Sequence, residues 1–253
     1  MAKNGMKFSR GYSGQVCAPS RTMLMLGKHL GHTTIRGNDG AYTPLLASDV
    51  TVAKVLKDAG YTTGLAGKWG LGNFGTTGYP NAQGFDTFVG QDTQVGCHDW
   101  YPLALCNNTV HEATINTPAD LAYISCLGPH STCTWANDLV KTTSVAFIRD
   151  SAAKTNTPFF LYCSSTTPHA GNLHGSGPKP ALFSGYNPVP YPYNTRFANQ
   201  TGVGPNGHPL WSDKEKLFAS AVWAQDGIVG AVLDELEALS IEKNTVVFFS
   251  GDK

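Results

Sequence analysis

The clearest periodic pattern in the first quarter of the chain covers one short segment. Val52, Val55, Leu56 and Ala59 fall at positions i, i+3, i+4 and i+7, and Gly60 follows them. This spacing places the four apolar side chains on one helix face, and glycine is frequent at helix C-termini. The pattern predicts an amphipathic helix that packs against a core.

Three further helices are predicted from end signals and spacing. Residues 19–26 begin with a proline and end before Gly27, which suits a C-terminal cap. Residues 137–152 form the next helix. A long helix follows Ser212, which makes a capping-box pattern with Glu215. Its apolar positions are Leu217, Ala221, Ala224, Ile228, Ala231 and Leu239.

Short runs that favour β structure alternate with these helices. They are residues 61–67, 84–90, 158–164 and 245–253. The last run, "TVVFFSGDK", is of the type found in buried parallel strands. The alternation predicts an α/β fold class, with a mostly parallel sheet and helices on both faces.

Two segments do not fit this alternation. Residues 91–135 show no sustained period and contain four clustered cysteines, so we expect them to leave the sheet as an excursion. Residues 165–211 are rich in Gly, Pro, Asn and Tyr and too long for an ordinary connection, which predicts a functional surface loop. At 253 residues the chain could form one large α/β domain or two small ones.

Charge and hydropathy exclude some partners. Lys plus Arg equals Asp plus Glu at 18 each, and no run of like charge stands out. We therefore expect neither nucleic acid nor a membrane surface as the main partner. No apolar stretch approaches the length of a bilayer-spanning helix, so we expect no membrane span. Residues 1–14 lack the apolar middle of a signal peptide, and no targeting signal is visible.

The cysteine content favours an oxidising compartment. We expect two disulfides within residues 97–133, in any of three pairings, and a buried free thiol at Cys163; Cys17 stands apart. Sequons begin at Asn107 and Asn199, which is consistent with secretion. The four clustered residues are Cys97, Cys106, Cys126 and Cys133.

Cys17 lies where the first predicted helix starts, with Arg21 one turn further on. The positive end of the helix dipole and the guanidinium both favour negative charge at this corner. Free backbone N–H groups and the guanidinium would also hold an anionic substrate. The alternative is a buried structural thiol beside a helix that begins with proline.

The surrounding segments carry a family resemblance. Residues 17–21 read "CAPSR", with "LMLGKHLGHTTIRGN" shortly behind, and residues 51–72 read "TVAKVLKDAGYTTGLAGKWGLG". Collinear blocks follow at 78–90, 98–102, 158–170 and the end of the chain. The chain resembles the type I sulfatases, arylsulfatase-like members of the alkaline-phosphatase superfamily. The resemblance implies a single sulfatase catalytic domain over 1–253, with an alkaline-phosphatase-like α/β core.

The resemblance also implies roles for individual residues. In the family, the Cys of C-x-P-x-R becomes formylglycine, whose hydrate attacks sulfur, so Cys17 is the implied precursor. Arg21 would hold the hydrate and balance its charge. Lys68 would clamp a sulfate oxygen, and His169 would protonate the leaving oxygen. The alternatives are a solvated turn lysine and a surface histidine.

Asp252 follows the last predicted strand, and the resemblance makes it a ligand to Ca²⁺ or Mg²⁺, cations that prefer carboxylate oxygen. Formylglycine made from Cys17 is implied as a weaker metal ligand. The alternative is an aspartate that caps a turn.

The sequence departs from the family pattern at several positions. The motif G-K-W-H-L-G has Gly70 in place of its histidine, and glycine cannot transfer protons. His98 is a candidate replacement; His29 and His32 are weaker ones.

The ends depart as well. Residues 1–16 contain no aspartate, although family members have an adjacent metal-binding Asp pair ahead of the Cys signature. Lys253 follows Asp252 where Asn or His is usual, and its ammonium would repel a dication. We therefore expect a core that is incomplete at both ends, and a chain that by itself binds metal weakly and turns over little.

Three hypotheses stay open. The first is a sulfatase that hydrolyses aryl or carbohydrate sulfates through formylglycine made at Cys17 by the formylglycine-generating enzyme. The second is a phosphate-ester hydrolase of the same superfamily, although those phosphatases generally use Ser or Thr as nucleophile. The third is a truncated or degenerate, non-catalytic fold. The expected location is the secretory pathway, extracellular or lysosomal, or a periplasm-like compartment.

Overall fold

The structure is a computed structural model of the 253-residue chain. It describes residues 1–38, 43–116, 126, 129, 131–171, 189–203, 205, 207 and 209–252.

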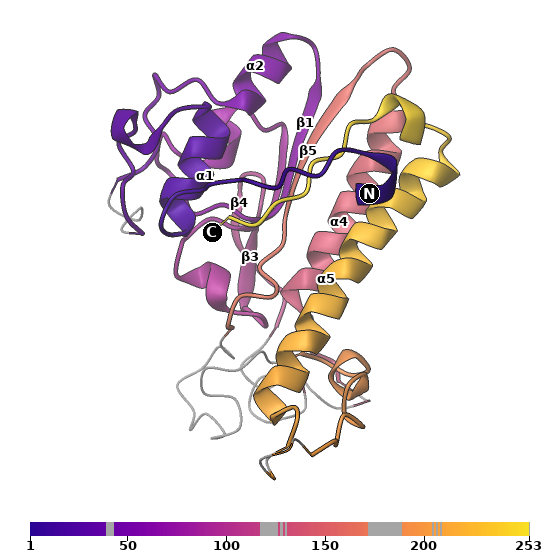
Figure 1. The fold of residues 1–253 in the computed structure, drawn as a ribbon. Helices are drawn as coiled ribbons and strands as arrows, with labels where there is room; N and C mark the ends of the chain where they lie inside the picture. Colours follow the sequence, from indigo (N-terminus) through magenta and orange to yellow (C-terminus); the bar gives the residue numbers. More distant parts are fainter. Residues whose placement is uncertain are drawn as a thin grey trace.

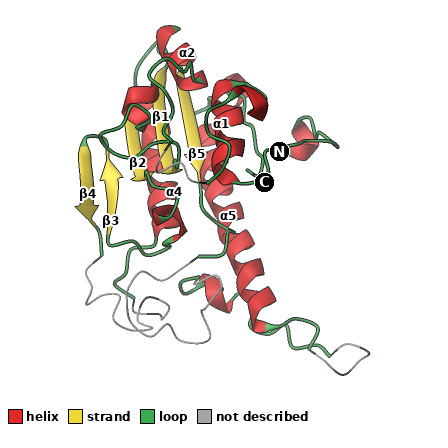
Figure 2. Cartoon of the chain, turned by 90° about the vertical axis from the view of Figure 1, so that its left-hand side faces the viewer, coloured by secondary structure: helices red, strands yellow, loops and turns green. Residues whose placement is uncertain are grey.

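A five-stranded mixed sheet forms the centre, in the order β4-β3-β2-β1-β5 (Figure 2). β1 (Thr62–Lys68) lies between β2 (Thr87–Gln91) and β5 (Phe159–Ser164), and both pairings are parallel. β3 (Ala104–Asn107) and β4 (Val110–Thr114) extend the sheet in antiparallel fashion from β2. The parallel strands agree with the predicted strands, with ends shifted by at most three residues.

Helices cover both faces of the sheet, as predicted for an α/β fold (Figure 1). α1 (Cys17–Leu26) and α2 (Val52–Asp58) lie on one face, and α4 (Ala136–Ala152) and α5 (Asp213–Ala238) lie on the other. Among the described residues, the short 3-10 helices are Ala2–Asn4, Leu30–His32, Pro80–Gln83, Gly96–His98, Tyr193–Thr195 and Glu242–Asn244.

β1 is the strand on which both faces pack. Leu65 joins a buried cluster on the α1 and α2 side, with Met25 of α1 and Ala53 of α2. On the opposite side, a Cβ at Gly64 would meet the Phe147 ring of α4 at 2.5 Å. Because successive side chains point to opposite faces and both faces are covered, β1 is buried from Thr63 to Lys68.

The helix ends follow the predicted signals. α1 ends at Gly27, whose φ of 60° is left-handed and whose N–H donates to the Met23 carbonyl. At the start of α5, Ser212 and Glu215 form the capping box, with Ser212 N–H donating to Glu215 Oε2 at 2.6 Å. Both predictions are confirmed.

The prediction that residues 91–135 leave the sheet is wrong for part of that range. β3 and β4 pair as a hairpin across Asn107 and Val110, and β3 joins β2 through Cys106 and Gly90. Each strand is only four or five residues long, too short to show a clear alternation in sequence. Residues 117–125, 127, 128 and 130 of this range lie outside the described residues.

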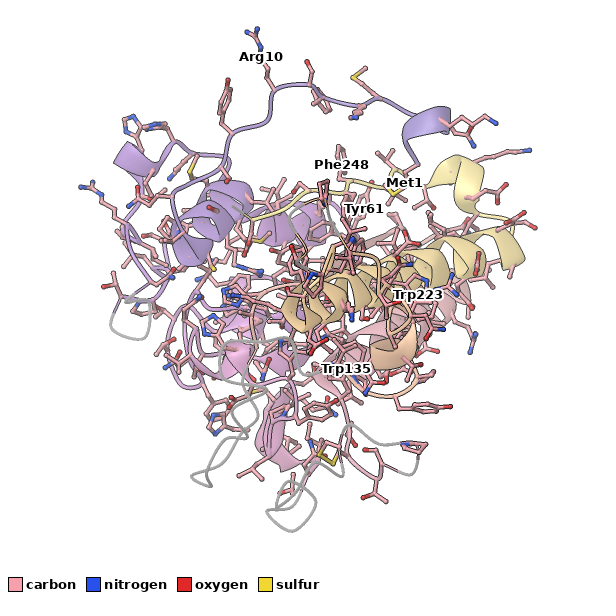
Figure 3. All side chains as sticks on the ribbon, turned by 60° about the horizontal axis from the view of Figure 1, so that its bottom comes forward. Met1, Arg10, Tyr61, Trp135, Trp223 and Phe248 are labelled. Carbon is pink, nitrogen blue, oxygen red and sulfur yellow. A yellow bond between two sulfur atoms is a disulfide. The ribbon has the colours of Figure 1, made fainter. Side chains whose placement is uncertain are left out.

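The prediction of a buried strand over residues 245–253 is also wrong. The segment has no strand partner among the described residues, and Val246 and Phe248 are 78% and 87% exposed. An apolar run becomes a buried strand only where another strand offers hydrogen bonds and helices cover its faces. The segment before α1 is exposed as well, with Arg10 standing clear of the body (Figure 3).

The predicted loop over residues 165–211 is described only in part, because residues 172–188, 204, 206 and 208 lie outside the described residues. Its described parts contain one 3-10 helix and an isolated bridge between Val203 and Pro209.

α5 corrects the expectation that no segment approaches the length of a membrane span. By length and composition alone, its 26 residues could cross a bilayer. Here a face of small residues, including Ala221 and Ala224, is buried in a cluster with Trp100 and Trp135. A helix in the core of an α/β domain can have the same length and composition, and it packs in this way.

The cysteines form fewer disulfides than predicted. Cys126 and Cys133 are bonded, whereas Cys97 and Cys106 are separate buried thiols. They cannot pair where they lie, because Cys97 donates to the Gln91 carbonyl and Cys106 packs in the α1 and α2 core cluster. Cys163 is a free thiol as predicted, although it is only partly buried. The two sequon asparagines, Asn107 and Asn199, are exposed.

Candidate active site

The predicted site residues converge at the carboxyl ends of the parallel strands, where open α/β sheets place their sites. Lys68 is the last residue of β1. His169 follows β5, and His98 ends the 3-10 helix after β2. The N-terminus of α1, with Cys17 as its first residue, lies against these strand ends.

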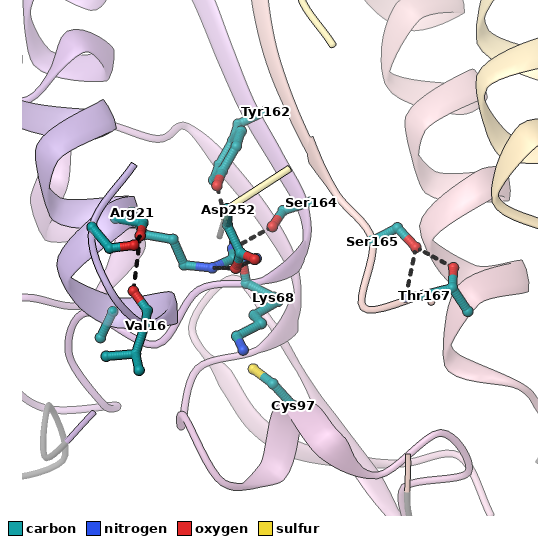
Figure 4. Close-up of polar contacts among 12 residues, drawn as sticks. Val16, Arg21, Lys68, Cys97, Tyr162, Ser164, Ser165, Thr167 and Asp252 are labelled. Atoms are coloured by element: carbon teal, nitrogen blue, oxygen red, sulfur yellow. Dashed lines mark hydrogen bonds and ion pairs between the residues drawn. The ribbon is translucent and has the colours of Figure 1, made fainter. Parts of the chain in front are cut away.

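Arg21 connects α1 to the strand ends and to the C-terminal segment (Figure 4). Its Nε and one terminal nitrogen approach Asp252 Oδ2 at 3.0 and 2.9 Å. The other terminal nitrogen donates to the Lys68 carbonyl at 2.9 Å, to the Tyr162 hydroxyl at 3.3 Å and to the Ser164 hydroxyl. A guanidinium has five donors in a fixed fork, and here the fork fixes three segments relative to one another.

The charge of Arg21 is secured by these partners. Burial works against its charged form, but Tyr162 and Asp252 outweigh this effect and raise the pKa of the guanidinium. The side chain therefore stays a cation although only 5% of it is exposed. This places a permanent positive charge one helical turn from Cys17.

Cys17 is the activated thiol of the site. Hydrogen bonds with His169 and His98 and the charge of Lys68 outweigh burial and Asp252, and they lower the pKa of Cys17 to about 5. The residue is 1% exposed. A thiol with this pKa is an anion at neutral pH, which is the character of a reactive cysteine.

The two histidines form a stacked pair. The rings of His98 and His169 lie 4.5 Å apart between centroids, with planes 7° from parallel. Nδ1 of His169 lies 2.7 Å from the Ala170 carbonyl oxygen. Because a carbonyl can only accept, Nδ1 is the donor in this contact.

A second thiol at the site is in the opposite state. Burial raises the pKa of Cys97 to about 12, even though Lys68 and Arg21 act to lower it. Figure 4 shows Cys97 beside the Lys68 side chain, which is itself buried. Cys97 is a neutral structural thiol, and Cys17 alone combines burial with activation by histidines.

A histidine at position 70 would be strained in this backbone. Its φ of 76° is left-handed, and a Cβ would lie 2.4 Å from Gln94 Oε1. Gln94 therefore fills the space that a side chain at position 70 would take. It is 4% exposed, and neither atom of its amide has a hydrogen-bond partner among the described residues. Sequence reasoning missed Gln94, because it belongs to no motif and only the fold brings its side chain next to Gly70.

The weaker histidine candidates do not join this group. His29 caps the start of the 3-10 helix Leu30–His32 and His32 ends it; both are exposed, and their rings contact each other edge to face at 6.5 Å. The structure brings His98, and not these residues, to Cys17.

The described donors at Cys17 do not fit a Ca²⁺ or Mg²⁺ centre. Asp252 supplies a carboxylate, but both approaching nitrogens of Arg21 take its Oδ2. Ca²⁺ takes about six to eight oxygen ligands. Across the described part of the chain, three grouped ligand atoms occur at Asp92, Cys106 and His111, not at Cys17. Lys253 lies outside the described residues.

The fold and the position of the site define the class. A mixed sheet with helices on both faces and a site at the parallel strand ends fits the alkaline-phosphatase-like α/β core. The chain resembles the structure of BT4656 in complex with its substrate D-glucosamine-2-N,6-O-disulfate, with a TM-score of 0.59 and 17% identity over 94% of this chain and 56% of that one. At this identity the likeness concerns the fold alone.

The family follows from comparison of the sequences. The sulfatase family model matches residues 1–253, and the chain belongs to the sulfatase family. An arylsulfatase of Hemicentrotus pulcherrimus is 28% identical over 273 residues, which cover 100% of this chain and 41% of that protein. Arylsulfatase G of Homo sapiens is 27% identical over 271 residues, with 100% and 45% covered. The chain thus spans less than half the length of these relatives.

Proposed function

We propose that this chain is the catalytic part of a sulfuric ester hydrolase that acts through formylglycine made from Cys17. The observation that carries the proposal is the position of Cys17. It opens α1, faces two histidines and a buried lysine, and has a pKa lowered to about 5, whereas burial raises the pKa values of Cys97 and Cys163.

The modified side chain would supply, as its hydrate, the oxygen nucleophile for sulfur. The residues around it have separate tasks. Lys68 presents a buried ammonium at position 17, where it would stabilise the negative charge that grows on the sulfate oxygens. Arg21 would balance the charge of the modified residue, and it holds Asp252 and the ends of β1 and β5 in place.

The histidines would move the protons. The His169 ring is fixed by the contact of Nδ1 with the Ala170 carbonyl and hydrogen-bonds position 17, so it would donate to the leaving oxygen. His98 is stacked on His169 and would replace, in proton transfer, the family histidine whose position is taken by Gly70. Gln94 fills the volume at Gly70, and its unpaired amide would hydrogen-bond the bound ester, since leaving buried polar atoms unpaired costs about 1–3 kcal/mol.

The substrate class is a sulfate ester of an aryl or carbohydrate alcohol. Two relatives are named arylsulfatases, and a structure of the same fold carries a disulfated glucosamine as its substrate. The proposed partner in maturation is the formylglycine-generating enzyme. The Cys126–Cys133 disulfide and the exposed sequons support a location in the secretory pathway.

No step is assigned to a metal, because the described donors at Asp252 do not fit one. We propose that the 253-residue chain binds Ca²⁺ weakly. Isothermal titration of the chain with Ca²⁺ should give little heat, and tight one-site binding would contradict this.

The decisive experiment follows the fate of Cys17. The natural protein that contains this chain is produced with and without the formylglycine-generating enzyme, and the peptide spanning residues 17–21 is analysed by mass spectrometry. The expected result is an aldehyde at position 17 together with hydrolysis of an aryl sulfate. Cys17→Ala is the inactive control, checked for folding by circular dichroism.

Paired substrates separate the alternatives. A matched aryl phosphate should be hydrolysed much more slowly than the aryl sulfate. Preference for the phosphate would favour a phosphate-ester hydrolase. A thiol that stays unmodified, with no hydrolysis of either ester, would favour a non-catalytic fold.

A further inference from the structure

A second group of potential ligands lies on the antiparallel side of the sheet. Asp92, Cys106 and His111 each offer one ligand atom, and these three atoms all lie within 4.8 Å of one another. They come from three segments: the end of β2, the middle of β3 and the start of β4. None of them has a task in the proposed hydrolysis.

The sheet register explains why the three side chains meet. Cys106 pairs with Gly90 across β2 and β3, and Asp92 follows Gly90 by two residues. Residues two apart along a strand face the same side, so Asp92 and Cys106 share one face. His111 is on the neighbouring strand of the hairpin, and its Nε2 lies 3.9 Å from Asp92 Oδ2.

The buried carboxylate of Asp92 has few partners that stabilise its negative charge. Asp92 is 5% exposed. Among the described residues, its side chain accepts one hydrogen bond, 2.7 Å from the Phe74 N–H, and its nearest cationic candidate is His111 at the limit of ion-pair distance. A buried carboxylate without a close cation is costly, because burial removes its hydration. A bound cation would remove this cost.

The surroundings would hold the ligands in place. The His111 ring stacks on Phe74 at 4.7 Å, and Phe74 also donates to Asp92, so one residue orients two ligands. Tyr79 lies beside Cys106, and its hydroxyl is fixed because it donates to the Asn108 carbonyl at 2.6 Å. The His111 side chain is 37% exposed, which gives an ion a path from solvent.

The donor types select the metal. One sulfur, one imidazole nitrogen and one carboxylate oxygen suit Zn²⁺ and similar transition-metal dications, and not Ca²⁺ or Mg²⁺, which require oxygen. Tetrahedral coordination by three protein ligands leaves a fourth position for water. We propose that Asp92, Cys106 and His111 form a transition-metal site, of the Zn²⁺ class, separate from the Cys17 centre.

Binding of Co²⁺ tests the site directly, because Co²⁺ replaces Zn²⁺ and absorbs light. The protein is titrated with Co²⁺ in a Cys17→Ala background, which removes the activated thiol as a competing ligand. The expected result is one equivalent of bound Co²⁺, with the intense visible bands of tetrahedral geometry and a near-ultraviolet thiolate-to-metal band. Zn²⁺ should displace the Co²⁺, and excess Ca²⁺ should not.

Two variants assign the ligands. Cys106→Ser should abolish the thiolate band. His111→Ala should weaken Co²⁺ binding by more than about tenfold, because loss of a residue that only supports a ligand already costs about tenfold or more in metal affinity. Cys163→Ser and His32→Ala are the matched controls outside the group and should bind as the parent does. Because Cys106 is in the core, its variant is checked by circular dichroism.

The outcome is decided without reference to sulfate hydrolysis. If Cys106→Ser fails to fold, His111→Ala decides alone, because that side chain is partly exposed and its removal leaves the core unchanged. Unchanged affinity in His111→Ala would overturn the proposal. So would a failure of the parent protein to bind either Zn²⁺ or Co²⁺.

Discussion

His98 and His169 stack ring on ring at the thiol of Cys17, with centroids 4.5 Å apart. One ring follows β2 and the other follows β5, so the fold and not the local sequence creates the pair. Both rings hydrogen-bond the thiol of Cys17, so a proton donor for a leaving oxygen would lie directly beside the reacting position.

Replacing His169 by Gln should lower kcat for a sulfate ester by about 10²–10⁴-fold, the range for loss of a general acid. The loss should be largest for alkyl or sugar sulfates and smallest for a nitrophenyl sulfate, whose leaving group needs no proton. Steady-state kinetics over a series of leaving groups measure this. His32→Gln, at an exposed 3-10 helix, is the matched control. Equal losses across the series would contradict a role as proton donor.

The local elements could be predicted from sequence where the signal itself is local. α1 ends at Gly27 and α5 begins at the Ser212 capping box, because both signals act on adjacent backbone groups. β5 could be predicted from its apolar run, and β1 from a short segment that favours β structure. The hairpin of β3 and β4 could not, because its strands are too short to show a period.

Long-range relationships were predicted less well. Apolarity indicates that residues 245–250 favour burial, but not whether a neighbouring strand is there to receive them. Cysteine clustering in sequence predicted a second disulfide, yet Cys97 and Cys106 belong to different elements that face different neighbours. Gln94 becomes a candidate only through Gly70, which is 24 positions earlier in the chain.

The candidate site was predicted more fully because two family signatures contain it. The motifs of the resemblance include Cys17, Arg21 and Lys68, and the structure brings these residues together. Asp252 also reaches the site, but as the partner of Arg21, which the sequence did not indicate.

The unmodified protein should become more stable as pH rises from about 5 towards 9. The pKa of Cys17 is lowered from an ordinary 9.0 to about 5, so between these values the unfolded chain binds a proton that the folded chain does not. The free energy of unfolding therefore rises with pH in this window, and the contribution is lost as pH falls through about 5. Urea unfolding at several pH values measures the slope.

Two variants assign that slope to one thiol. Cys17→Ala should flatten it, because the titrating group is gone. Cys163→Ser should leave it unchanged, because burial raises the pKa of Cys163 above its ordinary 9.0, outside the window. Parallel slopes for the parent and Cys17→Ala would rule out an activated Cys17.

Gly70→Ala should lower the free energy of unfolding by about 2 kcal/mol. The left-handed backbone alone costs a non-glycine residue about 1–2 kcal/mol, and the new Cβ would overlap Gln94 Oε1 at 2.4 Å. Gly75 is the matched control, since its φ of 79° is nearly the same and a Cβ there meets nothing within 4 Å. Gly75→Ala should therefore show the backbone cost alone.

A double-mutant cycle separates the two costs at Gly70. Gln94→Ala in the Gly70→Ala background should recover the overlap part and leave the backbone part, so the two changes should not be additive. Additive losses in urea unfolding would show that Gln94 does not fill the space at Gly70.

Arg21→Lys should destabilise the protein although the charge is kept. A lysine has one nitrogen in place of the fork, so it cannot reach Asp252, the Lys68 carbonyl and the Ser164 hydroxyl together. We expect a loss of about 3 kcal/mol in the free energy of unfolding, at the low end for a broken buried ion pair, because the Asp252 side chain is 29% exposed.

Arg149 offers the matched control for that substitution. Two of its nitrogens donate to the Glu235 carboxylate in a similar way, but its side chain is 63% exposed. Water can therefore replace the hydrogen bond that a lysine at this position would lose. Arg149→Lys should shift the urea midpoint much less than Arg21→Lys. If both shifts are equally small, Arg21 does not hold α1, the strand ends and the Asp252 segment together, and the position of Cys17 must depend on other contacts.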